Sequence, residues 1–394
     1  MAIQVGVGSS KRINSFIAGK DAASIARDKM GRGRPDLTII FASVIFDQEE
    51  MLKGVLSVVG DSPLVGCSGA GEITTKGPEK KSIVVLTLRS DSLRATIGLG
   101  GAISRDAREA GQQTAREASK VRGENRHIFM MMPDGLKGNG ADIVRGVQEI
   151  LGTSFPIVGG SAGDDFLFQQ TYQYYNDRVL SDAVPGVLFA GPITCAFGAR
   201  HGWRALGKHR VVTRAKANVI YEIDDEPAIR IYEEYFGKGV EELSQEPLAR
   251  MAILYPLGMS VPGEEEYLLR NALRVEKDGS LVCVAEVPEG SEVRLMMGSR
   301  ETCIKAARTA AQQALDSLGE AKAELAIVFN SISRYKLLGR RGSLEIDAIR
   351  EVLGGDIPLV GFYTYGEQAP LRAEMNVGQS YFHNETIVIL LIGE

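Results

Sequence analysis

Hydrophobic and polar positions follow a pattern that occurs three times along the 394 residues. Each copy has a helical stretch, a short aliphatic run, an apolar stripe at helical spacing, a glycine motif and another aliphatic run. The glycine motifs are SPLVGCSGAGEIT at 62–74, FPIVGGSAGDDF at 155–166 and IPLVGFYTYGEQAP at 357–370. Their shared glycines, Gly66, Gly159 and Gly361, are 93 and 202 residues apart, the second interval about twice the first. Such self-similarity indicates a duplicated supersecondary unit.

The periodicity predicts the order helix, strand, helix, strand, loop, strand in each copy. The expected first helices span 15–30, 104–120 and 299–315, and the strands after them span 37–43, 127–133 and 325–331. Apolar stripes at 52–59, 144–151 and 346–353 predict the second helices, and the last strands are expected at 82–88, 186–191 and 386–392. Ser104 and Ser299 are predicted N-caps, and Asp47 with Glu50 is a predicted capping box.

Residues 201–298 have no counterpart elsewhere in the chain, which explains the doubled interval. The pattern predicts short strands, including 216–224 and 248–257, around one helix at 227–237. We expect Pro227 in the first turn of that helix and Gly237 at its C-terminal cap. Lys-Asp-Gly at 277–279 predicts a hairpin turn within 272–287.

We therefore predict an α/β fold of duplicated helix–strand–helix–strand units in mixed sheets. Two regions, 1–200 with two units and 201–394 with the inserted segment and the third unit, are expected to pack around a shared cleft.

Composition narrows the class of protein. Hydrophobic residues make up 44% of the chain, charged residues 24%, and the mean hydropathy is -0.04, as in ordinary globular proteins. A net charge of -5 gives no basic footprint, so a nucleic-acid partner is not expected. No apolar run approaches the roughly 18 residues of a membrane span, and the N-terminus lacks a signal-peptide layout. Widely spaced cysteines fit reduced thiols, and the four histidines lack metal-ligand spacing. These features predict a cytoplasmic protein without a metal site or a membrane partner.

The motifs resemble a known family. PLVGCSGAGEIT and PIVGGSAGDDF are similar to the FIST N-terminal domain. GWRALG at 202–207, the segment 211–237, PLVGFYTYGEQAP and FHNETIVIL are similar to the FIST C-terminal domain. The resemblance implies an intracellular sensory module for a small ligand, with amino acids as the class, that signals through a separate protein such as a histidine kinase of a two-component system. It also implies an alternative, a haem-binding nitric oxide sensor; no cofactor is expected otherwise.

The variable residues of the glycine motifs are the candidate ligand contacts. The third motif combines aromatic walls, a hydroxyl and a carboxylate, so we expect a pocket there that is lined by Tyr363, Thr364, Tyr365 and Glu367, with His383 and Asn384 behind it. In a zwitterion site the carboxylate takes the ammonium group, while backbone N–H groups take the carboxylate of the ligand. The other motifs contribute the candidates Cys67, Ser68, Glu72, Ser161 and Asp164. His383 is expected to hold the glycine motif by a hydrogen bond, with axial ligation of haem as the alternative.

One motif raises an enzymatic alternative. GGSAG at 159–163 matches the G-x-S-x-G nucleophile elbow, and Ser161, Asp164 or Asp165, and His383 would form a nominal triad. The elbow needs a helix directly after its serine, whereas residues 164–177 have the alternation of a strand or hairpin. We therefore expect binding without turnover and keep a hydrolase centred on Ser161 as the second alternative.

Overall fold

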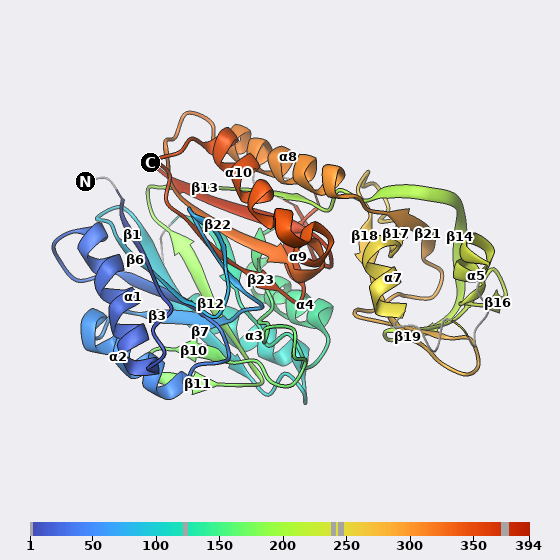
Figure 1. Cartoon of the computed structure of the whole chain (residues 1–394), viewed down its shortest axis with the longest axis horizontal. Helices are drawn as coiled ribbons and strands as arrows, with labels where there is room; N and C mark the ends of the chain where they lie inside the picture. Colours follow the sequence, from blue (N-terminus) through green and yellow to red (C-terminus); the bar gives the residue numbers. More distant parts are fainter. Residues whose placement is uncertain (1–2, 121–124, 238–241, 243–247, 372–377) are drawn as a thin grey trace.

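The computed structural model describes residues 3–120, 125–237, 242, 248–371 and 378–394. Three six-stranded mixed sheets and their helices form the body, and a fourth, eight-stranded sheet forms a lobe beside it (Figure 1). Each body sheet contains one parallel pair, next to which runs an antiparallel strand. The predicted α/β class with mixed sheets is confirmed.

The body consists of three units with the same order of elements, except that the third has two additional short helices between its second strand and the helix that follows in the other units. The first unit has β1 (Gln4–Ser10), α1 (Ser15–Met30), β2 (Leu37–Ala42), α2 (Gln48–Val59), β3 (Leu64–Ser68), β4 (Glu72–Thr74), β5 (Gly77–Glu79) and β6 (Ile83–Arg89). The second has β7 (Arg94–Gly101), α3 (Ala107–Ala118), β8 (Arg126–Met131), α4 (Gly140–Leu151), β9 (Ile157–Gly160), β10 (Gln173–Tyr175), β11 (Arg178–Leu180) and β12 (Ala183–Ala190). The third has β13 (Thr194–Arg200), α8 (Arg300–Leu318), β22 (Ala323–Ser331), α9 (Ile332–Leu338), η1 (Gly339–Arg341), α10 (Gly342–Leu353), β23 (Leu359–Thr364), β24 (Glu367–Pro370), β25 (Ser380–His383) and β26 (Ile387–Gly393).

The three shared glycines occupy equivalent positions in the parallel strands, as expected from the repeat. Gly66 lies in β3, Gly159 in β9 and Gly361 in β23. A Cβ at any of them would collide with a carbonyl oxygen of the neighbouring parallel strand, that of Ile40, Met131 or Val328. A glycine therefore recurs at this position because the neighbouring strand leaves no room for a Cβ, and not because the chain turns there.

Each unit gives its hairpin to the sheet of another unit. Hairpin β10–β11 pairs with β3 of the first unit, β24–β25 pairs with β9 of the second, and β4–β5 pairs with β23 of the third. Within the hairpins, Glu72, Gln173 and Glu367 occupy equivalent positions, and all three are fully buried. We call this arrangement the hairpin exchange.

The body has one central core and three peripheral ones. The inner faces of the three sheets share an apolar core to which equivalent strand residues such as Ile39, Met130 and Ile327 contribute. Helices α1, α3 and α8 cover the outer faces and pack very closely on the first strand of their unit. Glycine allows this approach, because a Cβ at Gly8, Gly100 or Gly198 would collide with a backbone carbonyl of the covering helix.

Residues 201–298, the inserted unit, form the lobe (Figure 1). It contains β14 (Arg204–Lys216), β15 (Val219–Ile223), β16 (Glu226–Pro227), α5 (Arg230–Phe236), α7 (Leu248–Leu254), β17 (Leu257–Met259), β18 (Leu268–Arg270), β19 (Ala272–Val275), β20 (Leu281–Cys283) and β21 (Glu292–Met297). The predicted hairpin is confirmed as β19–β20, and Gly237 caps α5 in the left-handed conformation.

Three local predictions are wrong. Pro227 lies in β16 and not in a helix, since α5 begins at Arg230. Residues 248–257 are not a strand but form α7, and β17 follows at Leu257. The N-cap of α3 is Asp106, which accepts a hydrogen bond from the backbone N–H of Glu109, while Ser104 donates to Asp182. Ser299 is the N-cap of α8, as predicted.

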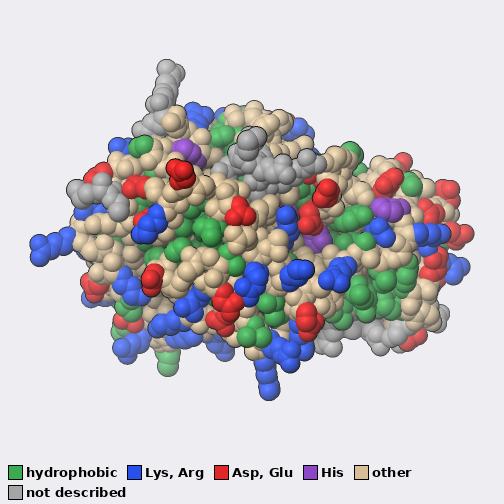
Figure 2. All heavy atoms as spheres, turned by 90° about the horizontal axis from the view of Figure 1, so that it is seen from above, with side chains coloured by type: hydrophobic (Ala, Val, Ile, Leu, Met, Phe, Trp, Pro, Cys, Tyr) green, Lys and Arg blue, Asp and Glu red, His purple; other side chains and the backbone are tan. Residues whose placement is uncertain are grey.

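The surface gives two further findings. Basic and acidic side chains are interspersed on the face shown in Figure 2. Within the described ranges, no helix has both the length and the apolar character that a membrane crossing requires.

The packing role of the shared glycines predicts the effect of one methyl group. Gly361→Ala should destabilise the fold by about 3 kcal/mol or more, because the backbone that its Cβ meets has no room to move. Gly355→Ala is the matched control, since no atom lies within 4 Å of its Cβ position, and it should change stability by less than about 0.5 kcal/mol. Urea unfolding measures both; equal effects would contradict the packing role.

Candidate ligand-binding site

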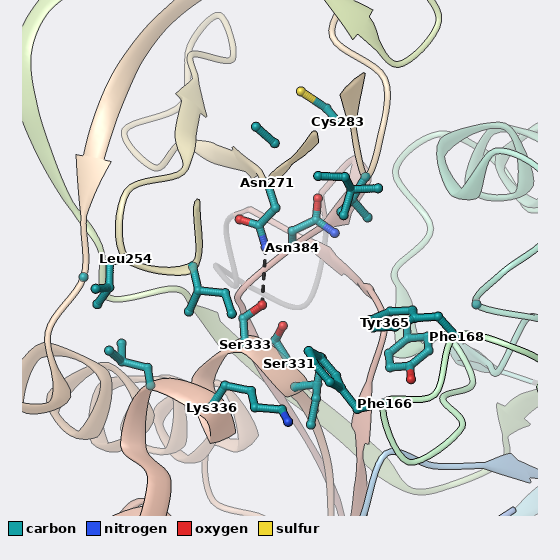
Figure 3. Close-up of a pocket in the computed structure, with 18 of the residues that line it drawn as sticks. Phe166, Phe168, Leu254, Asn271, Cys283, Ser331, Ser333, Lys336, Tyr365 and Asn384 are labelled. Atoms are coloured by element: carbon teal, nitrogen blue, oxygen red, sulfur yellow. Dashed lines mark hydrogen bonds between the residues drawn. The ribbon is translucent and has the colours of Figure 1, made fainter. Parts of the chain in front are cut away.

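A cavity of about 1330 Å³ lies between the body and the inserted unit (Figure 3). The body contributes the ends of β22 and β23, α9, and the loops after β8 and β25. The inserted unit contributes α7, the β18–β19 segment and the end of β20. The cavity therefore lies at the carboxyl ends of parallel strands, where α/β proteins commonly bind ligands.

Three of the places where the units differ from one another border this cavity. The second unit has eight additional residues, the insertion loop 164–171, between Gly163 and Tyr172, which are equivalent to the adjacent pair Ala70 and Gly71 of the first unit. The third unit has α9 between β22 and α10, and the inserted unit between β13 and α8. Each of these segments supplies lining residues, including Phe168, Lys336 and Asn271.

Asp164 organises the insertion loop. Its carboxylate accepts hydrogen bonds from the backbone N–H groups of Phe168, Gln169 and Gln170, at 2.6–3.0 Å, and from the Tyr365 hydroxyl. Phe168 has a positive φ of 54°, a conformation that these bonds hold in place. Its ring stacks on Tyr365 with centroids 4.8 Å apart, which forms the aromatic wall of the cavity.

A fully buried arginine anchors α9. Arg334 pairs with Glu345 of α10 and donates to the carbonyls of His201 and Cys303. Since His201 is the first residue of the inserted unit and Cys303 lies in α8, this one side chain ties the cavity-lining helix to three neighbouring segments.

Lys336 lies two residues further along α9. Its ammonium group is 3.8 Å from the ring centre of Phe166, within cation–π range. Burial and the neighbouring Lys80 lower its pKa. The cation therefore lies at the cavity beside an aromatic side chain.

Amides and hydroxyls form another part of the wall. The Asn271 side-chain N–H donates to Ser333 at 3.3 Å, and Ser331 and Asn384 also line the cavity (Figure 3). Cys283 lines it as well; burial raises the pKa of this thiol to about 12, so it stays protonated at neutral pH.

The structure separates the eleven predicted site residues. Only Tyr365 and Asn384 line the cavity. The buried Tyr363 packs against Tyr335, and Thr364 donates to Glu367. The others lie behind the wall or in the body: Cys67, Ser68, Glu72, Ser161, Asp164, Glu367 and His383. The binding role of the eleven as a set stays a prediction.

Glu367 is not the loop carboxylate expected from the sequence. It is the first residue of β24 and fully buried, because the hairpin exchange places it against Gly160. Burial raises its pKa to about 8, against the opposing effect of hydrogen bonds from Thr364 and the Thr386 backbone. Glu72, its counterpart in the first unit, is likewise buried, with its pKa raised to about 8.

The nominal catalytic triad is not assembled. Ser161 is buried and accepts a hydrogen bond from the Gln368 side chain. His383 bonds instead to the Ala369 carbonyl at 2.9 Å, and burial lowers its pKa to about 4. A loop and the β10–β11 hairpin follow Ser161 where an elbow requires a helix.

Sequence reasoning missed Phe166, Phe168, Asn271, Ser333 and Lys336. Phe166 ends the second glycine motif but has no counterpart in the other two, and the other four lie outside the motifs, so the search for shared motifs passed over them. Comparing the lengths of the units could have indicated these residues, because residues 164–171 and 332–338 have no equivalents in the other units.

The burial of Glu367 predicts a pH dependence of stability. Its pKa is about 8 in the folded state against an ordinary 4.5, so between these values the folded state binds more protons than the unfolded state. The free energy of unfolding therefore falls as the pH rises through this window, by up to about 1.4 kcal/mol per pH unit from this group. Glu367→Gln should fold, because its amide oxygen still accepts the Thr386 N–H. It should also make the decline of the free energy of unfolding from pH 5 to 8 shallower, because glutamine does not titrate. Chemical denaturation across this range measures the slope. The exposed Glu351→Gln is the control, and an unchanged slope in Glu367→Gln would refute the assignment.

Comparison with known proteins agrees with the motifs. Residues 36–226 match the FIST N domain, and residues 228–370 match the FIST C domain. An uncharacterised protein of Mycobacterium tuberculosis is 25% identical over 383 residues, covering 94% of this chain and 95% of its own. One of Methanocaldococcus jannaschii is 25% identical over 307 residues, covering 73% and 59%.

Solved structures resemble the chain only weakly. A chorismatase covers 100% of this chain and 99% of its own at 10% identity, with a TM-score of 0.37.

The two domain matches meet inside the inserted unit, whereas the regions predicted from the sequence meet at its start. By pairing with β26, β13 belongs to the third unit. Together the two matches span most of the 394 residues, and the chain belongs to the FIST family.

Proposed function

We propose that this protein senses a small, amino-acid-like ligand in the cavity between the body and the inserted unit, and reports it to a separate signalling protein. FIST domains are sensory domains of signal transduction proteins, which supports a sensory role. A histidine kinase is the partner class we propose, and the cytoplasm the compartment, where the four buried free thiols would remain reduced.

The observation that supports this site most strongly is the convergence of three segments that depart from the repeat. Packing explains why equivalent positions stay alike in three units. It does not explain why the insertion loop, α9 and the inserted unit all border one cavity. Segments added at separate points of the chain and meeting at one place are what a binding function requires.

The chemistry of the wall supports a zwitterion with an apolar side chain. Phe166, Phe168 and Tyr365 give an aromatic surface, Lys336 a cation for a carboxylate, and Asn271 with Asn384 polar groups for an amine. Ligand pockets typically combine apolar walls with a few polar anchors in this way. The volume leaves room for an amino acid with a large side chain and its bound water.

The two alternatives find less support. The described part of the wall includes no histidine, and His383 lies behind it at a pocket of only about 10 Å³. These residues do not fit a histidine-ligated haem. Ser161 is engaged with Gln368 and has no histidine partner, so we propose binding without hydrolysis.

A thermal-shift screen with the proteinogenic amino acids tests this proposal. A ligand at 100 times its dissociation constant should stabilise the fold by roughly 2.7 kcal/mol. Phe168→Ala should weaken binding about tenfold, since Phe168 forms the aromatic wall. Leu167→Ala is the matched control: it removes a neighbouring side chain of the same exposure, 54%, that does not line the cavity.

Two outcomes would overturn the proposal. One is a ligand whose binding is weakened equally by Phe168→Ala and Leu167→Ala. The other is an amino acid panel that shifts no melting temperature while hemin gives a sharp Soret band, which would establish the haem alternative.

A further inference from the structure

One part of the cavity wall holds acceptor atoms without donors. Asn271 and Asn384 line the cavity and are at least nine-tenths buried, and the Oδ1 atom of each has no hydrogen-bond partner among the described residues. Directly after Asn384 comes Glu385, which lies behind the lining residues; it is fully buried, and neither carboxyl oxygen has a close hydrogen-bond partner among the described residues. Buried polar atoms are normally satisfied, so unsatisfied ones grouped at a cavity indicate a missing donor.

The position of Glu385 is unusual when the three units are compared. Lys81, Asp182 and Glu385 are equivalent residues before the last strand of each unit, and all three have a positive φ of 52–57°. Lys81 is exposed and Asp182 half-buried, whereas the third unit has a fully buried carboxyl group at this place. The backbone turn explains the conformation, but it does not explain a charged group that α9 and the inserted unit cover.

Buried carboxyl groups outnumber buried cations around Glu385. Three buried carboxyl groups, of Glu345, Glu367 and Glu385, surround one buried cation, Arg334. Arg334 is paired with Glu345, and Glu367 accepts from Thr364 and Thr386. The Asn271 amide donates one hydrogen bond to Ser333, and its second N–H acts as a donor toward the Glu385 carboxyl. Glu385 thus has this amide beside it but no paired cation among the described residues, and burial raises its pKa well above the usual range.

We propose that Asn271, Asn384 and Glu385 form the subsite for an ammonium group, and that this subsite makes the protein select ligands with a primary amine. The inference rests on the proposed function and deepens it. An ammonium group brings three N–H donors and one positive charge, which match the unpaired acceptors and the excess of buried carboxyl groups. Lys336 on α9 lines another part of the cavity, so the carboxylate of a zwitterion would bind there, away from the ammonium group.

Binding would be coupled to proton release. Below its raised pKa, the unliganded Glu385 is protonated; when the ammonium binds, the carboxyl gives its proton to the solvent and becomes the counter-ion. Affinity for amines should therefore rise with pH below the pKa of the unliganded Glu385. The titratable and charged groups that act on it from neighbouring elements are Arg334, Glu367, Tyr232 and Cys303, with Glu345 acting through Arg334.

Isothermal titration with three probes tests the subsite: phenylalanine, phenethylamine, which has only the amine, and 3-phenylpropanoate, which has only the carboxylate. The wild type should bind phenethylamine at least tenfold more tightly than 3-phenylpropanoate. Glu385→Gln should weaken binding of the two amines at least tenfold. Glu367→Gln is the matched control, because it replaces another fully buried carboxyl of the same cluster, one that already accepts hydrogen bonds from Thr364 and Thr386. Titration in two buffers of different ionisation enthalpy should show protons released with phenethylamine and none with 3-phenylpropanoate.

The outcomes separate this inference from the proposed function. If 3-phenylpropanoate binds as tightly as phenethylamine, or if both glutamine variants weaken amine binding equally, the ammonium subsite is refuted while the cavity remains a binding site. If none of the probes binds and the amino acid screen also gives no shift, both proposals fail. Should Glu385→Gln not fold, Asn384→Leu removes the wall amide and leaves Glu385 in place; unchanged phenethylamine affinity in that variant would also refute the subsite.

Discussion

Three backbone hydrogen bonds tie the strand ends of the units into a closed cycle, from Ala70 to Tyr363, from Tyr365 to Ser161 and from Gly163 to Ser68, at 2.8–3.1 Å. Each bond joins one unit to another, and the exchanged hairpins reinforce the same three junctions. At this buried centre water does not replace a lost partner, so no junction can open without leaving polar backbone groups unpaired. The cycle fixes the ends of β3, β9 and β23, and through β23 it places Tyr365 at the cavity.

This constraint also explains where the protein tolerates change. The insertion loop begins at Asp164, just after the cyclic bond of Gly163, and ends before Tyr172, whose carbonyl accepts from Ser68. Residues added between those two fixed points leave the pairing of all three sheets intact. The inserted unit likewise lies between β13 and α8, outside the exchanged hairpins. A rigid, symmetric body thus carries asymmetric additions. These additions form the cavity, and the body holds them in fixed positions.

The repeated elements were accessible from the sequence, while the site was not. The helix over 15–30 and the glycines Gly66, Gly159 and Gly361 follow from periodicity, because each unit repeats the same local requirement. The first strands β1, β7 and β13 escaped prediction, since the glycines that let a helix pack on them are poor strand formers. Glu367 was misjudged for another reason: its burial depends on a strand from a different unit, and local spacing does not contain that information. The lining residues depend on how three unrepeated segments meet in space, which no single motif reveals.

The hairpin exchange also determines when the chain can fold during its synthesis. Thr75, in the turn of the first hairpin, bonds to Leu359, and the two residues are 284 positions apart. At about 5–20 residues per second, the ribosome needs roughly 15–60 s to make the strand that this hairpin awaits. During that interval the edge of β4 has no partner, and exposed strand edges are sites of aggregation. The unfinished chain therefore exposes this strand edge for most of its translation, a consequence of the same interlocking that makes the finished body rigid.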